Sequence, residues 1–344
     1  MATIKDVARL AGVGVGTASR VISGNGPVSQ ETAGRVRKAI EQLDFRPSNI
    51  ARALSSKTRG TIGLYVPYFS GPFFGPVLQS VNFELREVDR HMVAANGCGF
   101  GDPRRQALDG VDFLIQRECD GIIVFSNELL DQDLIALHRK QPKIAVLNRM
   151  IPELEAQCFS LDHHQGGRIA AQVLVSQGHR RLAVISGPHS ASDNEARLAG
   201  FFAELTCRGI AREDVPVIDG DFNMQSGWEA ATRLLEQHEG FTGLFCANDN
   251  MAMAAIARFQ QSGRSVPSDL SVVGYDDSEP AAYTFPRLTT IRVPIQEMAA
   301  HACRLLLYQC YGIVLEIRRE FIPALVWRES VTPGPFAAAT EPVT

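Results

Sequence analysis

Polar and aromatic side chains follow most of the strands predicted between residues 61 and 291, and their types are those that bind polyhydroxylated ligands. Carboxylate, amide and guanidinium groups form paired hydrogen bonds with adjacent hydroxyls, and an aromatic ring can cover an apolar C–H face. Taken one at a time, each is better explained by helix capping or core packing. Together, polar groups at the ends of five strands predict a sugar-like ligand in a cleft. The strand-end residues are Phe73, Asn148, Asp162, Asp193, Arg197, Phe222, Asn248 and Asp276.

Several neighbours of these positions have a structural interpretation. Asp249 and Asp162 are candidate caps for the helices that follow them, and Phe74 is a candidate core residue. His163 and His164 are interpreted as surface residues at a helix start. No nucleophile elbow, metal-spaced triplet or phosphate loop accompanies them, so the chain is not predicted to be an enzyme and no cofactor or metal is expected.

The elements that must position these residues alternate between short apolar strands and helices. Such alternation builds parallel sheets covered on both faces, and the series runs twice, which predicts two similar α/β lobes. Ligands of such sheets bind beyond the carboxyl ends of the strands, so two facing lobes form a cleft. The strands are expected at 61–66, 92–95, 121–125, 143–147, 158–161, 181–185, 215–218, 243–246 and 270–275. The helices are expected at 76–89, 105–117, 165–177, 195–208, 226–237 and 250–262.

The N-terminal sixty residues differ in charge from the rest of the chain. They hold ten Lys or Arg and four Asp or Glu, a balance of +6, which leaves −10 for residues 61–344 of a chain whose total is −4. A basic module on an acidic body suggests a polyanionic partner. A solvated basic face with no partner explains the charge equally well.

The basic segment is predicted to form three short helices. Thr3 is a candidate cap for the first helix and Gly12 ends it, while Ser29 is a candidate cap for the third. Two helices joined by a tight glycine-containing turn are typical of a helix-turn-helix, whose second helix enters the major groove of DNA. Arg20 has the geometry to bind guanine, whereas Thr17 and Ser19 suit phosphates. The residues of the second helix expected to face DNA are Val15, Gly16, Thr17, Ser19 and Arg20.

The glycines at positions 12, 14 and 16 superficially resemble a dinucleotide-binding loop. That motif requires a preceding buried strand and the spacing G-x-G-x-x-G. Here a charged helix precedes the glycines and the third comes one residue early, so nucleotide binding is not predicted.

The runs at residues 3–13, 19–22 and 28–32 resemble the DNA-binding domain of the lactose/galactose repressor family of bacterial transcriptional regulators, and residues 45–54 resemble that family's hinge. The likeness extends to about residue 330. It implies a small all-α helix-turn-helix headpiece and a periplasmic-binding-protein-like α/β body of two doubly wound lobes. Outside the second helix, the DNA-binding residues that it implies are Thr3, Asn25, Ser29, Asn49, Ala51 and Leu54.

In the family, the hinge becomes a helix only on operator DNA in a dimer, and Leu54 occupies the position that wedges into the minor groove. Pro47 precedes a helix start, Ala51 and Ala53 are small enough for close helix approach, and Leu54 is an apolar wedge. A plain linker is the alternative interpretation.

The second helix departs from the family pattern. Gly14 replaces the usual Ser, Gly16 stands at a base-reading position and Ala18 replaces a usual Val. Gly in place of Ser as a cap costs only a few tenths of a kcal/mol. Gly16 in the helix interior costs about 0.8–1 kcal/mol relative to Ala. We therefore expect a looser headpiece that draws less specificity from this helix.

The resemblance also implies roles for the strand-end residues. Arg197, Asn248 and Asp276 match the family's effector-binding positions, and further effector contacts are implied at Phe73, Asn148, Asp193 and Phe222. Residues 189–198, 147–152 and 287–295 resemble the galactose-type members in particular. The expected effector is therefore a small sugar, D-galactose, which controls the affinity of a repressor for its operator.

Composition limits the other function classes. No apolar run reaches the ~18 residues needed to span a membrane, and no secretory signal is found. Seven scattered cysteines without a C-x-x-C pair suit reduced thiols in a cytoplasmic protein. A transport-type sugar-binding protein would need a signal peptide and would have no use for a helix-turn-helix, so it is a weaker alternative. A sugar-modifying enzyme is also a weaker alternative. The tail lacks a leucine heptad, the pattern of the tetramer-forming coiled coil that some family members append. A homodimer on a near-palindromic double-stranded operator is therefore expected.

These features predict how the chain is divided into domains. The expected parts are a helix-turn-helix domain (1–46), a hinge (47–60), an N-terminal effector-binding lobe (61–162 and 292–322), a C-terminal effector-binding lobe (163–291 and 323–332) and a tail (333–344).

Overall fold

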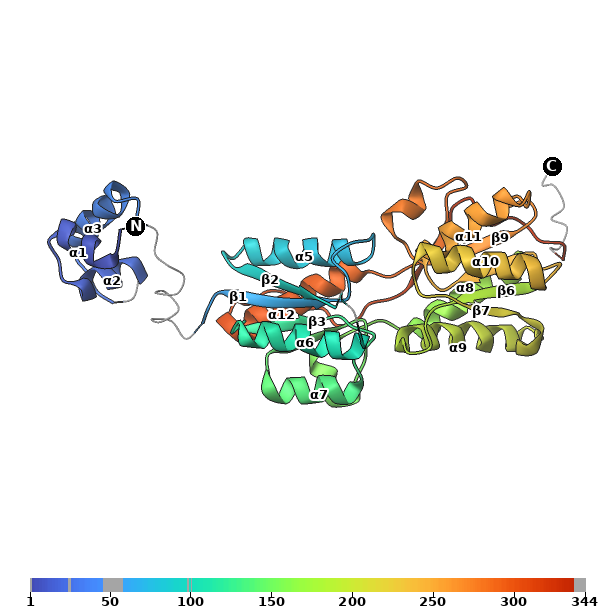
Figure 1. Ribbon diagram of the computed structural model, residues 1–344, viewed down its shortest axis with the longest axis horizontal. Helices are drawn as coiled ribbons and strands as arrows, with labels where there is room; N and C mark the ends of the chain where they lie inside the picture. The colour runs from blue at the N-terminus through green and yellow to red at the C-terminus, as the bar shows by residue number, and fades with distance from the viewer. Residues whose placement is uncertain (1, 24–25, 46–57, 98, 100, 337–344) are drawn as a thin grey trace. The chain divides into compact units, whose positions relative to one another are not determined.

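The computed structural model describes residues 2–23, 26–45, 58–97, 99 and 101–336 of the 344-residue chain. The chain divides into two compact units, residues 1–61 with 118–120 and residues 62–117 with 121–344, which are described separately below. Figure 1 labels most of the helices and strands.

The first unit contains the three predicted headpiece helices, α1 (Ile4–Ala11), α2 (Val15–Ser23) and α3 (Gln30–Gln42). The Thr3 side chain accepts a hydrogen bond from the Asp6 amide, and the Asp6 carboxylate accepts one from the Thr3 amide at 2.9 Å, which completes a capping box. Gly12 ends α1 with φ +64°, a conformation that glycine adopts without strain. A small core of Val7, Ala11, Val36 and Ala39 joins α1 to α3.

The second unit contains two sheets. The first has the order β2-β1-β3-β4-β5 and the second β11-β10-β9-β8-β6-β7. Except for β11, which pairs antiparallel with β10, the recorded pairings in both sheets are parallel. The strands of the first sheet are β1 (Thr61–Val66), β2 (His91–Asn96), β3 (Gly121–Val124), β4 (Ile144–Leu147) and β5 (Cys158–Phe159). Those of the second are β6 (Leu182–Ser186), β7 (Val217–Asp219), β8 (Gly243–Cys246), β9 (Ser271–Asp276), β10 (Thr289–Arg292) and β11 (Ala324–Val326).

Helices cover both faces of each sheet. Figure 1 shows α5 and α6 on opposite sides of the first sheet, and the α10–α11 pair opposite α9 on the second. The helices of the first lobe are α5 (Phe74–Arg86), α6 (Pro103–Gln116), α7 (Asp131–Lys140) and α12 (Ile295–Tyr311). Those of the second are α8 (His163–Ser176), α9 (Ser192–Cys207), α10 (Met224–Gln237) and α11 (Asp249–Gln261).

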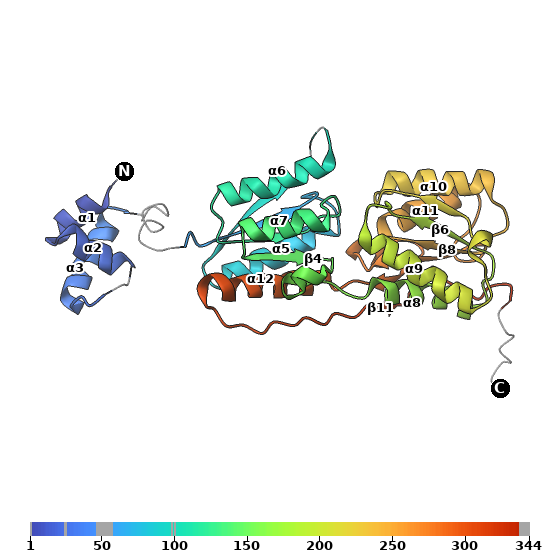
Figure 2. The ribbon, with the colours of Figure 1, turned by 90° about the horizontal axis from the view of Figure 1, so that it is seen from below.

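The chain crosses between the lobes more than once. Helix α12 packs against α5 and strands β3, β4 and β5, although β10, which precedes it, belongs to the second sheet. After α12 an extended segment returns to β11 in the second sheet, a path visible in Figure 2. Each lobe is therefore built from discontinuous parts of the sequence.

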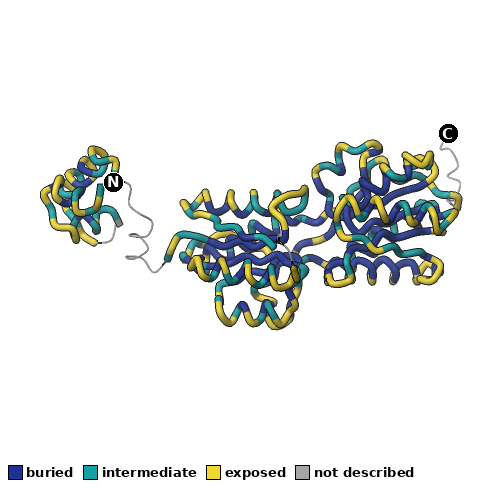
Figure 3. Tube along the Cα trace, in the orientation of Figure 1, coloured by how far each residue is buried: buried dark blue, intermediate teal, exposed yellow. Residues whose placement is uncertain are grey.

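The strands are buried because helices lie on both sides of them. Strands β3, β4, β6, β8 and β9 are buried along their whole length, as the dark central segments of Figure 3 show. Near-continuous apolar strands are what parallel sheets require. The predicted strands and helices of the body are confirmed within a few residues, whereas α7, α12, β10 and β11 were not predicted.

None of the helices in the described part of the chain is both long and apolar enough to cross a membrane.

Candidate functional site

A buried arginine organises the polar residues at the edge of the second sheet. The Arg197 side chain on α9 is only 2% exposed. Its Nη1 donates to the backbone oxygen of Ala247 at 2.6 Å, and its Nη2 to Asp193 Oδ2 at 2.5 Å. Burial is the largest influence and alone would lower the pKa of Arg197, but the charges of Asp193, Tyr275 and Asp276 together outweigh it and the pKa is raised. The guanidinium therefore stays charged inside the protein, held by one carboxylate.

Two aromatic rings flank this guanidinium. Its central carbon lies 4.1 Å from the centre of the Tyr275 ring and 5.6 Å from that of Phe222. Both rings stabilise the cation through their π faces. Arg197 Nε is buried and has no hydrogen-bond partner among the described residues, so one donor of this cation is still available.

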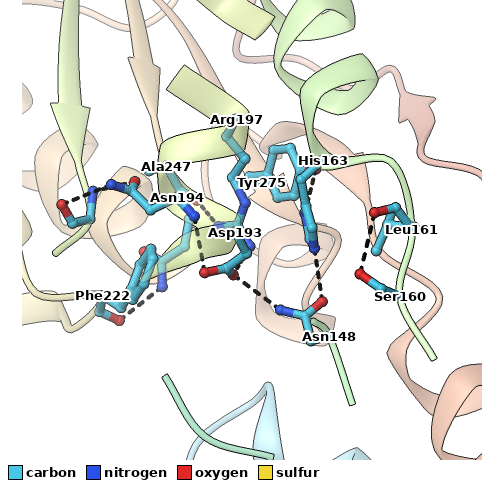
Figure 4. A network of polar contacts seen from close by, with 12 residues as sticks. Asn148, Ser160, Leu161, His163, Asp193, Asn194, Arg197, Phe222, Ala247 and Tyr275 are labelled. Carbon is cyan, nitrogen blue, oxygen red and sulfur yellow. Dashed lines mark hydrogen bonds and ion pairs between the residues drawn. The ribbon is translucent and has the colours of Figure 1, made fainter. Parts of the chain in front are cut away.

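Asn148 connects the first lobe to this network. It follows β4 with φ +59°, a left-handed conformation that Asn tolerates better than most residues. Its Nδ2 donates to Asp193 Oδ2 at 3.1 Å, so Asp193 is bonded to both Asn148 and Arg197. Figure 4 shows Asp193 between the two. The strand-end residues of the two lobes are thus joined by a direct hydrogen bond.

His163 is part of the same network, and its prediction as a surface residue is wrong. It is the first residue of α8 and is buried, with Nε2 3.0 Å from Asn148 Oδ1 and Nδ1 3.1 Å from the Tyr275 hydroxyl. Burial, reinforced by the charge of Arg197, lowers the pKa of His163 to about 3. The exposed neighbour His164 fits the prediction.

Asp276 ends β9 and faces the network without a partner. Burial raises the pKa of Asp276 well above its ordinary value, and Arg197 opposes that shift. Among the described residues, no hydrogen bond to its carboxyl group is found, which leaves this group able to bond to a ligand.

Asp249 does not cap α11 as predicted. Asn248 is the cap, because its Oδ1 accepts from the Met251 amide at 3.0 Å. Asp249 instead points into the protein, where it accepts from the Ser278 amide at 2.7 Å and from Thr290 Oγ1 at 2.6 Å. Burial raises the pKa of Asp249 to about 7. The capping role predicted for Asp162 is confirmed, since its Oδ1 accepts from the Gln165 amide at 2.9 Å.

The aromatic candidates have different surroundings. Phe222 has φ +54°, and its backbone oxygen accepts from Asn248 Nδ2 at 2.8 Å, which places its ring beside Arg197. Phe73 lies at the start of α5 in a cluster with Phe74 and Phe125, with ring centres 5.6 and 5.7 Å away.

The structure therefore brings most of the predicted residues together and adds two that sequence reasoning missed. Hydrogen bonds and ring contacts join Asn148, Asp193, Arg197, Phe222 and Asn248, and Asp276 is linked to them by charge. No recorded contact joins Phe73 to them. The missed residues are His163 and Tyr275, whose only sequence signal is that each adjoins a predicted strand-end Asp, Asp162 and Asp276 respectively.

No cluster of three or more His, Cys, Asp or Glu side chains suited to a metal ion is found in the described residues.

The predicted DNA-facing helix is only partly covered by the rest of the headpiece. Val15 and Gly16 are exposed, and apart from its chain neighbours and the nearby backbone of α2, no atom lies within 4 Å of where a Cβ on Gly16 would stand. Arg20 Nε donates to the backbone oxygen of Gly16 at 3.3 Å. Thr17 and Ser19 are half-buried, and Ala18 is buried.

The remaining predicted DNA contacts divide into two groups. Thr3 and Ser29 cap α1 and α3, with the Ser29 hydroxyl accepting from the Thr32 amide at 3.3 Å. The other four lie outside the described residues, namely Asn25, Asn49, Ala51 and Leu54.

A helix-turn-helix unit and a two-lobed α/β body with a buried polar network define the class of DNA-binding regulators that carry a ligand-binding body. Comparison with known proteins supports this. Residues 3–48 match the family model "Bacterial regulatory proteins, lacI family", and residues 171–331 match the "Periplasmic binding protein-like domain". The chain belongs to the lacI family.

Named relatives and solved structures agree. The transcriptional regulator GalR of Escherichia coli K12 is 38% identical over 96% of both chains, and the repressor PurR of Photobacterium profundum is 36% identical over 96% of this chain and 99% of that one. A lac repressor dimer bound to operator and an anti-inducer is 27% identical, with a TM-score of 0.85 over 96% of this chain and 99% of the other. A LacI-family regulator from Burkhoderia phymatum is 52% identical, with a TM-score of 0.78 over 79% and 99%.

These relatives are named regulators or repressors, not enzymes. The protein is accordingly a DNA-binding transcriptional repressor with a periplasmic-binding-protein-like body, and not an enzyme.

Proposed function

We propose that D-galactose, bound beside the Arg197 network between the two lobes, controls the affinity of this repressor for its operator. The observation that carries the proposal is the Asp193 carboxylate, which accepts from both Asn148 of the first lobe and Arg197 of the second. A ligand that bonds to these groups interacts differently with different lobe arrangements. Such a difference in affinity is what shifts a conformational equilibrium.

The choice of galactose is supported by sequence relatives named GalR and GalS, at 35–38% identity. The chemistry agrees, since unpaired Asp276 and the free Nε of Arg197 provide an acceptor and a donor for adjacent hydroxyls. Structures of other relatives hold cellobiose or ribose. A different sugar or a nucleoside is therefore the alternative effector.

For the DNA side, we propose that α2 enters the major groove with Val15, Gly16, Thr17, Ser19 and Arg20 toward the duplex. Thr3, Asn25 and Ser29 then contact the DNA backbone, and Asn49, Ala51 and Leu54 contact the DNA at the operator centre. The exposure of Val15 and Gly16 supports the orientation of α2.

We also propose that the protein is a homodimer that binds a near-palindromic operator. Tyr283 and Phe285 are 80% and 89% exposed, and a pair of large exposed aromatic side chains favours a protein contact. The lobe boundaries proposed above are supported by α12, which packs on the first sheet, and by β11, which pairs in the second.

Fluorescence anisotropy of a labelled palindromic operator with a central C·G step, at fixed salt, tests the proposal. Salt is fixed because phosphate contacts make affinity strongly salt-dependent. We expect D-galactose to change the operator affinity of the wild type, and Asp276→Asn to bind operator without that response. Asp109→Asn, an exposed substitution on α6, is the control and should respond like the wild type.

Each of the other outcomes overturns a defined part of the proposed function. Tight binding that ignores galactose rejects this effector and leads to a panel of sugars and nucleosides. No preference over a random duplex rejects the proposed DNA contacts.

A further inference from the structure

The hydrogen bonds around Asn148 determine which way its amide points. Asp193 already accepts from Arg197, and an ionised carboxylate has no hydrogen to donate. The Asn148 atom 3.1 Å from Asp193 Oδ2 must therefore be the NH₂ nitrogen. The Asn148 oxygen then faces His163 Nε2 at 3.0 Å.

This orientation also determines the protonation of His163. An amide oxygen can only accept, so Nε2 of His163 must carry the hydrogen. Because burial keeps the imidazole neutral, Nδ1 has none and accepts from the Tyr275 hydroxyl at 3.1 Å. Donation thus runs from Tyr275 to His163, from His163 to Asn148 and from Asn148 to Asp193. Figure 4 shows these three contacts.

A hydrogen on His163 Nδ1 instead of Nε2 is excluded, because it would place two hydrogen-bond acceptors against each other. If His163 carried its hydrogen on Nδ1, Nε2 would accept from Asn148 and the amide would turn over. The Asn148 oxygen would then face the Asp193 carboxylate, and two acceptors would meet in a buried place.

Close backbone packing holds His163 where this bond is made. A Cβ at Gly166 would collide with the Tyr275 hydroxyl, and one at Gly167 with the backbone oxygen of Arg197. On the facing helix, a Cβ at Gly200 would collide with the backbone oxygen of His164. Helices α8 and α9 therefore approach each other at glycines, which brings the His163 ring against Tyr275 and Asn148.

From these contacts we infer that His163 is a positioning residue, which holds the Asn148 amide in the one orientation that bonds the first lobe to Asp193. With its oxygen on His163 and one N–H on Asp193, Asn148 has a single N–H left. Among the described residues that N–H has no partner. Asn148 therefore presents a hydrogen-bond donor to a ligand. His163 determines this through its bond to the Asn148 oxygen and not through contact with the ligand.

The ring nitrogens of His163 test this inference without any effector. In the full chain labelled with ¹⁵N-histidine, protonated and unprotonated ring nitrogens are distinguished by their chemical shifts, and the His163 signals are those absent from His163→Asn. We expect the hydrogen on Nε2, with no titration between pH 8 and pH 5. A hydrogen on Nδ1, or titration within that range, overturns the inference.

A second test uses the affinity for D-galactose and so rests on the proposed function. Gln reaches the Nε2 position and keeps an N–H donor, whereas Asn reaches only the Nδ1 position. We expect roughly tenfold weaker binding in His163→Ala and His163→Asn, and recovery of most of the affinity in His163→Gln. His164→Ala, on the adjacent exposed residue, is the control and should bind like the wild type.

The outcomes separate the two proposals. Equal losses in His163→Asn and His163→Gln would mean that the ring only fills space, which overturns the positioning role. If the wild type does not bind D-galactose at all, the proposed effector fails, while the ring-nitrogen measurement still decides the role of His163.

Discussion

Arg197 and Asp193 form an ion pair that is almost completely removed from water, with side chains 2% and 4% exposed. Removing one partner of such a pair leaves a buried charge uncompensated, and this costs far more than the pair itself contributes. The same pair contacts Asn148 and two aromatic rings. Stability and the proposed binding site therefore depend on the same residues.

Asp193→Asn keeps the shape of the side chain but removes its charge. We expect the free energy of unfolding to fall by about 3–5 kcal/mol, measured by urea denaturation. Glu195→Gln on the same helix is the matched control, because Glu195 pairs with His189 at the surface and an exposed ion pair contributes little to stability. Similar losses in both variants would contradict a special role for the buried pair.

Asp249 should make the protein less stable as pH rises. The folded chain keeps the carboxyl proton up to a pKa of about 7, whereas the unfolded chain releases it near the ordinary value of 3.8. Between these values the folded state binds more protons, so the free energy of unfolding declines as pH rises.

Urea denaturation at pH 5, 6 and 7 should therefore show a shallower decline in Asp249→Asn than in the wild type. Asp109→Asn controls for the change of net charge, since Asp109 is exposed. Identical slopes in the wild type and Asp249→Asn would show that this group does not titrate in that range.

At the scale of the element, α2 combines exposure with a weak helix former. Gly16 lies inside α2, and a Cβ there would meet no atom within 4 Å. The same is true of Gly34 in α3. Glycine in a helix costs about 0.8–1 kcal/mol relative to alanine, so the headpiece carries two such costs.

Gly16→Ala and Gly34→Ala are each expected to stabilise the headpiece by up to about 1 kcal/mol. Hydrogen exchange of residues 15–23 and 30–42 in the full chain measures this. The variants should differ in operator affinity, because only Gly16 lies on the face proposed to read DNA. Equal effects of both variants on operator binding would argue against that face.

At the scale of the whole molecule, the proposed repressor couples two binding events. Coupling between sites typically amounts to about 1–3 kcal/mol and is reciprocal. The factor by which galactose changes operator affinity must then equal the factor by which operator changes galactose affinity. Titration calorimetry of galactose with and without operator, compared with the anisotropy data, checks this equality. Unequal factors would show that the two ligands do not share one conformational equilibrium.

The sequence by itself determined the features that depend on near neighbours in the chain. The capping box of Thr3 and Asp6, the turn at Gly12 and the strand–helix alternation all arise from contacts between residues close in sequence, or from the local periodicity of apolar residues. Helix α12 escaped prediction, as did strands β10 and β11 of the second sheet.

Only the tertiary structure decided how the site is assembled. His163 lies 112 residues from Tyr275 and 15 from Asn148, and Asn148 lies 45 from Asp193. Their contacts depend on the close packing of α8 and α9 and on the path of the chain between lobes. No local sequence pattern indicates contacts between residues so far apart in the chain. A histidine that is interpreted from the sequence as a surface residue is therefore a buried hydrogen-bond donor in the fold.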